Sequence, residues 1–291
     1  MRFCPVFFRK NFYTSILVVV VLALLFSPVQ ANNLWWREAQ NSGHVILFIF
    51  FAFVIYSQVK VKLPLVKTPL VYSFVLVIGF LLGVAIEILQ TLAQRDSSLN
   101  DLYGNFLGTV TGLCIIATYS LIKAQKTKTA VVTIICAASF LLLGMAPLIQ
   151  LSWHYMERDK AFPVIVDFDS SWSKSFVKYH KGSYPGVSIV ETEPDWSGYQ
   201  GLRLNIYSSS KQIIDINLRV HDSVHDQQQF DRFNMKLKIQ PGFNEFLVPI
   251  SVIKQGPAGR VLDITNIAGI ILFGHQWSEW QRLELSVISL E

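Results

Sequence analysis

Apolar runs in the first half of the chain restrict its possible folds more than any other feature. Five of them cover residues 13–26, about 44–59, 69–90, 102–122 and 129–151. The last three are long enough to cross a hydrocarbon core about 30 Å thick as helices that rise about 1.5 Å per residue. The run at 44–59 is short and needs flanking residues to span. Residues 1–155 are therefore predicted to form a bundle of about five transmembrane helices.

The first run has two interpretations. Basic residues precede it, and Val29 and Ala31 supply the small side chains of a signal-peptidase site. It is either a cleaved signal peptide or an uncleaved first span. Both interpretations leave residues 32–43 on the outer side of the membrane.

Basic residues mark one set of loops between the runs. The alternate loops hold only Arg37 and Arg95, together with acidic residues. By the positive-inside rule, the basic set lies in the cytoplasm and the chain after the fifth run is extracytoplasmic. The net charge of +5 thus reflects insertion into a cell (inner) membrane rather than binding of nucleic acid. The basic set comprises Arg2, Arg9, Lys10, Lys60, Lys62, Lys67, Lys123, Lys126 and Lys128.

The second half of the chain has a period of two. Leu202, Leu204 and Ile206, for example, alternate with polar side chains, and turn signals such as Pro241-Gly242 separate about eight short segments of this kind. This pattern is typical of half-buried strands in an antiparallel sheet. We predict a linker at residues 156–161 and an all-β antiparallel sandwich, a jelly roll, at residues 162–291.

Residues 87–112 combine polar side chains with apolar runs, and ionisable groups near hydrocarbon are functional candidates because they are costly there. One face of the third run and one face of the fourth are predicted to bring these groups together at the outer edge of the bilayer. Helix capping with interhelical hydrogen bonds, a ligand site and an ion path are the open interpretations. The polar residues are Glu87, Gln90, Arg95, Asp96, Asn100, Asp101 and Asn105.

Glycines recur at every fourth position on the same two runs. Small residues at this spacing let transmembrane helices approach closely. We expect the two glycine stripes to face each other, with the polar cluster at the mouth of their contact. They are Gly79 and Gly83 on one run and Gly104, Gly108 and Gly112 on the other.

The run E-x-x-Q, R-x-S-S, D-x-x-x-N-x-x-G-x-x-x-G within residues 87–112 resembles the signature of the VanZ-like family, small membrane proteins named after a teicoplanin-resistance protein. His44 also fits that pattern, whereas Gln40-Asn41 stands where an acidic-basic pair is expected. The resemblance covers about residues 12–122. It implies a cell-envelope location, a link to glycopeptide or lipid-glycan biology, and functional roles for Glu87, Gln90, Arg95, Asp101 and Asn105.

Glu87 and Asp101 are the candidate catalytic acid and base. Such a pair requires two carboxyl groups at a defined distance with separated pKa values, and the sequence fixes neither. Hydrolase motifs such as G-x-S-x-G and H-E-x-x-H do not occur, nor does a phosphate-binding glycine loop. A non-catalytic role is therefore favoured over an enzyme.

The segments DFDSSW, DWSGYQGLRLNIY and LRVHDSVHD resemble the galactose-binding-like jelly rolls of carbohydrate-binding modules. This resemblance implies a glycan partner and a structural calcium ion with Asp167 or Asp169 as a ligand. The alternative for each tryptophan is a place in the core. The candidate glycan-binding residues are Trp172, Trp196, Tyr199 and Trp277.

The H-D-x-x-H-D cluster, residues 221–226, contains possible zinc ligands. No third histidine-rich segment accompanies it, so a hydrogen-bonded turn is favoured and no metal site is predicted there. The three cysteines, Cys4, Cys114 and Cys136, all precede the strand region and offer it no disulfide framework.

These patterns together predict an integral membrane protein of the cell envelope that binds or senses an envelope glycan or a lipid-linked sugar at the outer leaflet. Two alternatives stay open. One is a membrane enzyme that acts on a lipid-linked glycan through Glu87 and Asp101. The other is a structural subunit whose sandwich binds another protein. The oligomeric state is left open.

Overall fold

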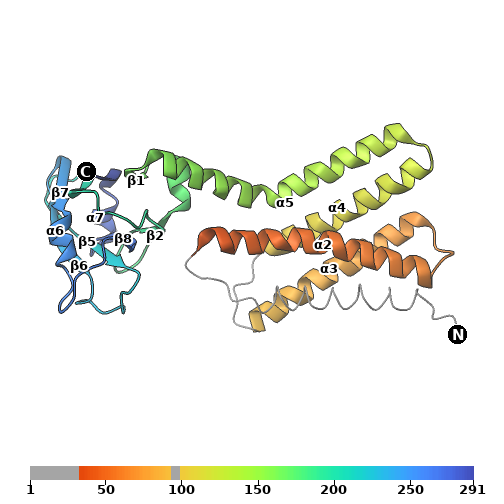
Figure 1. The fold of residues 1–291 in the computed structure, drawn as a ribbon, viewed down its shortest axis with the longest axis horizontal. Coiled ribbons are helices and arrows are strands. Elements are labelled where there is room, and N and C mark those ends of the chain that lie inside the picture. The colour runs from red at the N-terminus through yellow and green to blue at the C-terminus, as the bar shows by residue number, and fades with distance from the viewer. Residues whose placement is uncertain (1–32, 93–98) are drawn as a thin grey trace. The chain divides into compact units, whose positions relative to one another are not determined.

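A computed structural model describes residues 33–92 and 99–291 (Figure 1). The chain divides into two compact units, residues 1–150 and residues 151–291, each described here by itself. The predicted first span at residues 13–26 lies outside the described residues, as do Arg95 and Asp96.

Four helices of the described chain are long and apolar enough to cross a membrane, which supports membrane association. The side chain of Asn33 caps the first of them by accepting a hydrogen bond from the Trp36 N–H at 3.0 Å. This helix extends well beyond the run at 44–59, which removes the difficulty of a short span. The helices are α2 (Leu34–Lys62), α3 (Thr68–Leu92), α4 (Leu99–Lys123) and α5 (Thr127–Ala161).

Helix α4 packs against both α2 and α3. Gly108 lies against Val45, and Gly112, one turn further along α4, lies against Ile49 and Ala52, so α2 and α4 run in the same direction. The order of contacts with α3 is reversed, because Gly79 lies against Thr109 and Gly83 against Asn105. Helix α3 is therefore antiparallel to α4.

The prediction that the two glycine stripes face each other is wrong. Gly104, Gly108 and Gly112 face α2, whereas the α3 glycines receive the side chains of Asn105 and Thr109. Consecutive residues are about 100° apart around a helix. Asn105 and Thr109 each come one position after a glycine of the α4 stripe, so they face α3 while the glycines face α2.

This arrangement gathers lysines at one end of the bundle. Lys60 and Lys62 end α2, Lys67 precedes α3, and three more lysines lie where α4 ends and α5 begins, at Lys123, Lys126 and Lys128. The polar residues of α2, α3 and α4 lie toward the opposite end. Large apolar side chains along α3 and α5 are exposed, as expected for surfaces that contact lipid.

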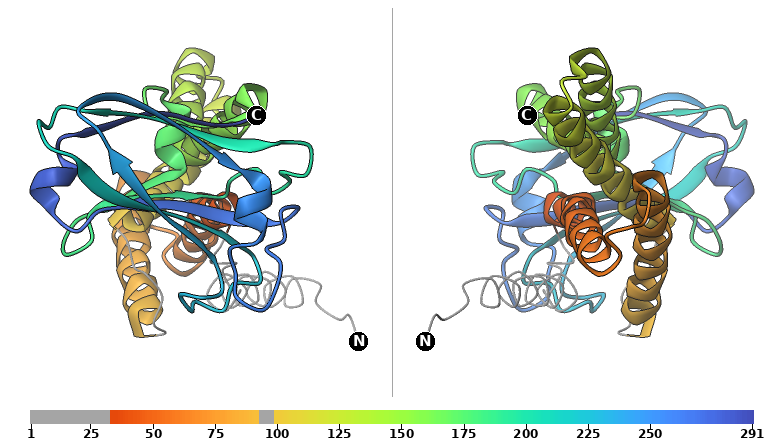
Figure 2. Two further views of the ribbon diagram at one scale, coloured as in Figure 1. Left: turned by 90° about the vertical axis from the view of Figure 1, so that its left-hand side faces the viewer. Right: turned by 90° about the vertical axis from the view of Figure 1, so that its right-hand side faces the viewer.

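The second unit is an antiparallel β-sandwich, which confirms the predicted fold class. Figure 2 shows its strands in two layers. The four-stranded sheet has the order β1-β9-β4-β7, and the five-stranded sheet has the order β2-β3-β8-β5-β6. The strands are β1 (Val164–Asp167), β2 (Val177–His180), β3 (Gly186–Val190), β4 (Gly201–Ser208), β5 (Ile214–Asp222), β6 (Phe233–Ile239), β7 (Gly242–Pro249), β8 (Ile267–Phe273) and β9 (Leu283–Leu290).

Strand β2 and three short helices are the elements of this unit that remain to be described. Strand β2 was not predicted, because only the first of its four residues is buried and no alternation is visible. The short helices are η1 (Trp172–Ser175), α6 (Ile250–Lys254) and α7 (Trp277–Trp280).

A single apolar core fills the space between the two sheets. The alternation of β4 and β5 turns Leu204, Ile206, Leu218 and Val220 into this core. The residues between them therefore point outward. This is why the outer face of the five-stranded sheet carries polar and aromatic side chains.

The last turns of α5 belong to the second unit. Arg158 donates hydrogen bonds to the Glu191 carbonyl at 2.7 Å and to the Glu193 carboxylate at 2.9 Å, and the ring of Tyr155 packs edge-on against Phe176. Residues 156–161, predicted as a linker, are thus helical and attached to the sandwich. A fragment that begins at residue 162 would lack these contacts.

Candidate functional site

The first candidate site is a buried polar cluster within the helical unit. His44 Nδ1 donates a hydrogen bond to Asn105 Oδ1 over 3.1 Å and so links α2 to α4. Their side chains are only 4% and 1% exposed. The structure therefore brings together two residues that the sequence analysis had selected from separate runs.

Three further buried polar atoms of these helices have no hydrogen-bond partner among the described residues. They are Ser42 Oγ, Gln90 Oε1 and Asn105 Nδ2, one from each of α2, α3 and α4. A buried polar group without a partner costs about 1–3 kcal/mol. At the His44–Asn105 pair, the amide N–H of Asn105 is therefore available to an additional polar group, and α2 and α3 each carry one more unsatisfied polar atom, on Ser42 and Gln90.

The candidate acid and base occupy different positions near this cluster. Asp101, in the first turn of α4, is buried, whereas Glu87, near the end of α3, is half-buried. Asp101 also lies within electrostatic range of Glu38 on α2. Neither Glu38 nor Ser42 was selected from the sequence, because a single polar residue at the start of an apolar run carries no recognisable pattern.

The second candidate site is the outer face of the five-stranded sheet, where aromatic rings gather near the end of β8. The ring of Tyr184 makes edge contacts with Phe273 and His275, at centroid distances of 6.3 and 5.6 Å. Lys181 Nζ lies 5.8 Å from the centroid of the Trp277 ring. Tyr184 is 61% exposed and Trp277 is 38% exposed, so both rings are accessible.

Strand register aligns polar side chains with these rings. Arg219 on β5 extends from one row toward Phe273 in the next, and its guanidinium carbon lies 5.0 Å from the ring centroid. One cross-strand row consists of His180, Gly186, Phe273, Asn217 and Lys236. The adjacent row consists of Lys178, Ser188, Ile271, Arg219 and Asn234.

Most of the aromatic residues selected from the sequence do not reach this face. Trp172 and Trp196 are buried, the latter completely, so their predicted contact with a glycan is wrong. Tyr199 packs its ring edge-on against Phe162 beside the core. Trp277 is the selected residue that lies on the surface near the aromatic rings. Phe273 was missed because it ends an apolar strand and reads as a core residue.

The predicted calcium ligands belong to a tight turn. Asp167 Oδ1 accepts a hydrogen bond from the Asp169 N–H at 3.1 Å, and Asp167 Oδ2 accepts one from the Ser170 hydroxyl at 2.6 Å. Among the described residues, a group of three potential metal ligands occurs only at His225, Asp226 and Asp231. The calcium site at Asp167 or Asp169 stays a prediction without a third ligand.

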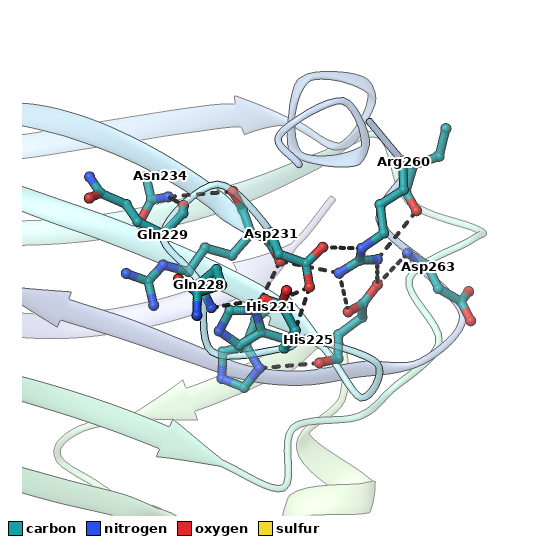
Figure 3. A network of polar contacts seen from close by, with 12 residues as sticks. His221, His225, Gln228, Gln229, Asp231, Asn234, Arg260 and Asp263 are labelled. Atoms are coloured by element: carbon teal, nitrogen blue, oxygen red, sulfur yellow. Dashed lines mark hydrogen bonds and ion pairs between the residues drawn. The ribbon is translucent and has the colours of Figure 1, made fainter. Parts of the chain in front are cut away.

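The H-D-x-x-H-D cluster is organised around Arg260 (Figure 3). Arg260 donates to both carboxylate oxygens of Asp222, at 2.5 and 2.9 Å, and its Nε donates to Asp231. His225 Nδ1 donates to the Asp231 carbonyl at 2.9 Å, and the Asp226 N–H donates to the Asp231 carboxylate. The arginine thus occupies the carboxylate of Asp231, one of the three potential metal ligands, and this favours the turn interpretation.

The pKa values of this cluster follow from the same contacts. The hydrogen bond from Arg260, with that from the Asp226 N–H, holds the pKa of Asp231 far below its usual range. Burial tends to raise the pKa of Asp222, but hydrogen bonds from Arg260 and the Asp263 N–H outweigh it and the pKa is lowered. Both carboxylates are therefore ionised at neutral pH.

No family model matches the chain, and no curated protein matches it. Among solved structures, it is similar to the family 11 carbohydrate-binding module from Clostridium thermocellum in complex with a β-1,3-1,4-mixed-linked tetrasaccharide, at 16% identity over 37% of this chain and 67% of that one, with a TM-score of 0.29. The solution structure of a family 11 module, CtCBM11, matches at 13% identity over 44% and 92%, with a TM-score of 0.31. An exo-β-agarase matches at 16% identity over 44% and 24%, also with a TM-score of 0.31.

Proposed function

We propose that the protein is a non-catalytic, membrane-anchored glycan-binding protein of the cell envelope, with a VanZ-like helical unit and a saccharide-binding face on its five-stranded sheet. The observation that supports this most is the pair of exposed rings of Tyr184 and Trp277, with the half-buried Phe273 ring against Tyr184, beside two polar cross-strand rows. Aromatic faces pack against the C–H faces of sugar rings, and neighbouring polar groups bind the hydroxyls.

The proposed orientation places the sandwich outside the cytoplasm and the bundle in the inner membrane. The lysine-rich end of the helical unit is the cytoplasmic end by the positive-inside rule. Helix α5 begins at this end, at Thr127, and runs the length of a span before the sandwich begins. The chain therefore enters the second unit on the opposite side of the membrane.

Replacing Phe273 or Trp277 by Ala should weaken glycan binding about fivefold, since an aromatic contact contributes about 1 kcal/mol beyond its buried area. The measurement is a glycan-array screen of the full-length protein in nanodiscs, followed by titration of the best ligand. Tyr207→Ala and Phe243→Ala are matched controls, because these paired residues are 43% and 65% exposed on the four-stranded sheet. Equal losses for the two pairs of variants would contradict the proposed face.

The buried cluster supports a second candidate, a site for the polar head of a lipid-linked sugar between α2, α3 and α4. The unpartnered Asn105 Nδ2 at the cluster favours this candidate, together with the unpartnered Ser42 Oγ on α2 and Gln90 Oε1 on α3. Glu87 and Asp101 stay the predicted acid and base of the enzymatic alternative, on the same substrate class.

Asn105→Leu should abolish co-purification of such a lipid, because it removes an unpartnered N–H at similar volume. It also removes the acceptor of the His44 hydrogen bond, so the thermal stability of the variant is measured beside lipid binding. Native mass spectrometry of the protein released from nanodiscs measures the bound lipid. Thr118→Val is the control, since its hydroxyl bonds to Thr133 and the Cys114 carbonyl elsewhere in the bundle. A wild-type protein that retains no lipid-linked sugar would leave the cluster a purely structural role.

A further inference from the structure

Two arginines on the outer face of the five-stranded sheet form no ion pair with any of the described residues. Arg219 lies in the middle of β5, and Arg232 immediately precedes Phe233, the first residue of β6. The Nε atoms of both are buried without a hydrogen-bond partner among the described residues. The Phe273 ring is the group that packs against the Arg219 guanidinium.

The neighbouring strands supply no free carboxylate to this pair within the described chain. Across β6, Arg219 pairs with Asn234, and across β8 it pairs with Ile271. Asp215, near the start of β5, forms an ion pair with Lys236 at 2.8 Å. At the other end of the strand, Asp222 and Asp231 are bound by Arg260. Asp226, in the connection to β6, accepts a hydrogen bond from the Gln228 N–H at 2.8 Å and forms no ion pair with either arginine among the described residues.

Burial and the neighbouring positive charge lower the pKa values of groups on this face. Burial, and next the charge of Arg232, lower the pKa of Arg219, and burial lowers the pKa of Arg232. The pKa of His221 is lowered by burial first, with smaller contributions from His225 and Arg219. The face thus holds two partly buried positive charges that destabilise one another in the absence of an anion.

We infer that Arg219 and Arg232 bind an acidic group, a carboxylate, sulfate or phosphate, carried by the glycan ligand. This inference rests on the proposed function and specifies its substrate class as acidic saccharides. The planar guanidinium fork matches such groups in a bidentate geometry, and charge-assisted hydrogen bonds of this kind are about twice as strong as neutral ones. Because Arg219 lies over Phe273, a sugar packed beside this ring brings its acidic substituent within reach of the arginine.

The test compares two probes with the same sugar chain, one charged and one neutral: tetragalacturonate and its fully methyl-esterified form. Full-length protein in nanodiscs is titrated with each by calorimetry, as wild type, Arg219→Gln, Arg232→Gln and Phe273→Ala. The wild type is expected to prefer the acidic probe at least tenfold, and this preference should fall as salt is raised. Each arginine variant should lose the preference and keep its thermal stability, whereas Phe273→Ala should weaken both probes.

A second arm separates a glycan acid from a free anion by titrating inorganic phosphate alone against the wild type and Arg219→Gln. Equal binding of the two saccharides, unaffected by Arg219→Gln, would overturn the inference and leave the proposed glycan binding intact. Binding of phosphate but of neither saccharide would keep an anion site and count against the proposed function. Absence of binding to all three probes would overturn the inference.

Discussion

Gly108→Ala is expected to separate α2 from α4 and to cause one of the two largest losses of stability among the variants considered. A Cβ at this position would lie 2.3 Å from the Val45 carbonyl oxygen and 2.9 Å from the Phe48 Cβ. The first neighbour is backbone and cannot rotate away, so the helices must move apart. Overpacking of this kind costs about 1–3 kcal/mol, and the His44–Asn105 hydrogen bond nearby would be disturbed.

Gly104→Ala is the matched control one turn away on the same stripe. A Cβ there would meet only the Val45 Cγ2, at 3.5 Å, which is an ordinary contact. The measurement is the fraction of protein that stays monodisperse after heating in detergent, together with its abundance in the membrane. Similar losses for both variants would show that the α2–α4 contact is not as close as described.

Arg260→Met is expected to destabilise the sandwich by about 3 kcal/mol, because breaking a buried ion pair leaves a charge without compensation. Asp222 is fully buried on its side chain and receives two hydrogen bonds from Arg260. The unfolding midpoint of the second unit should fall by about 10 °C, as followed by tryptophan fluorescence of the full-length protein.

Arg203→Met is the control for this substitution. Arg203 forms ion pairs with Glu245 and Glu291 at the surface of the four-stranded sheet, with about a third of its side chain exposed. Exposed pairs contribute about 0–1 kcal/mol, so the midpoint should change little. A larger loss for Arg203→Met than for Arg260→Met would contradict the central place given to Arg260.

Acid should reduce the difference between the wild type and Arg260→Met. The lowered pKa values of Asp222 and Asp231 stabilise the wild type above the ordinary aspartate pKa of about 3.9, and this contribution is lost as the pH falls through the folded values. In the variant, protonation of the buried Asp222 stabilises the folded state, because it removes a charge that has lost its partner. Denaturation at pH 7 and pH 3.5 should therefore show a larger difference at pH 7, and a constant difference would refute this explanation.

The apolar runs and the strand alternation were enough to predict both parts of the fold. Run length identifies a span, and a period of two identifies a strand with one buried face. Residues 156–161 were predicted as a linker, whereas they continue α5, and Arg158 forms an ion pair with Glu193 of the sandwich. A local pattern does not reveal such a distant partner.

The candidate sites were less predictable, because they depend on which neighbours share a surface. Alternation along β5 places Arg219 on the outer face, but its lack of an ion-pair partner among the described residues becomes visible only when the registers of β6 and β8 are known. The same holds for Trp196. Its indole ring suggested stacking on a sugar, although the core encloses the side chain completely. In the bundle, glycine spacing identifies a close contact but not the helix that makes it.

The sidedness of the sandwich decides whether its open sheet can meet an envelope glycan, and cysteine labelling in intact cells measures it most directly. Lys211→Cys lies in the exposed β4–β5 connection, and Lys126→Cys lies at the lysine-rich end of the bundle. Each is introduced after Cys4, Cys114 and Cys136 are replaced by Ser. An impermeant maleimide should label the cysteine at 211 in intact cells and the cysteine at 126 only after lysis. The reverse pattern would contradict an outward-facing glycan-binding sandwich.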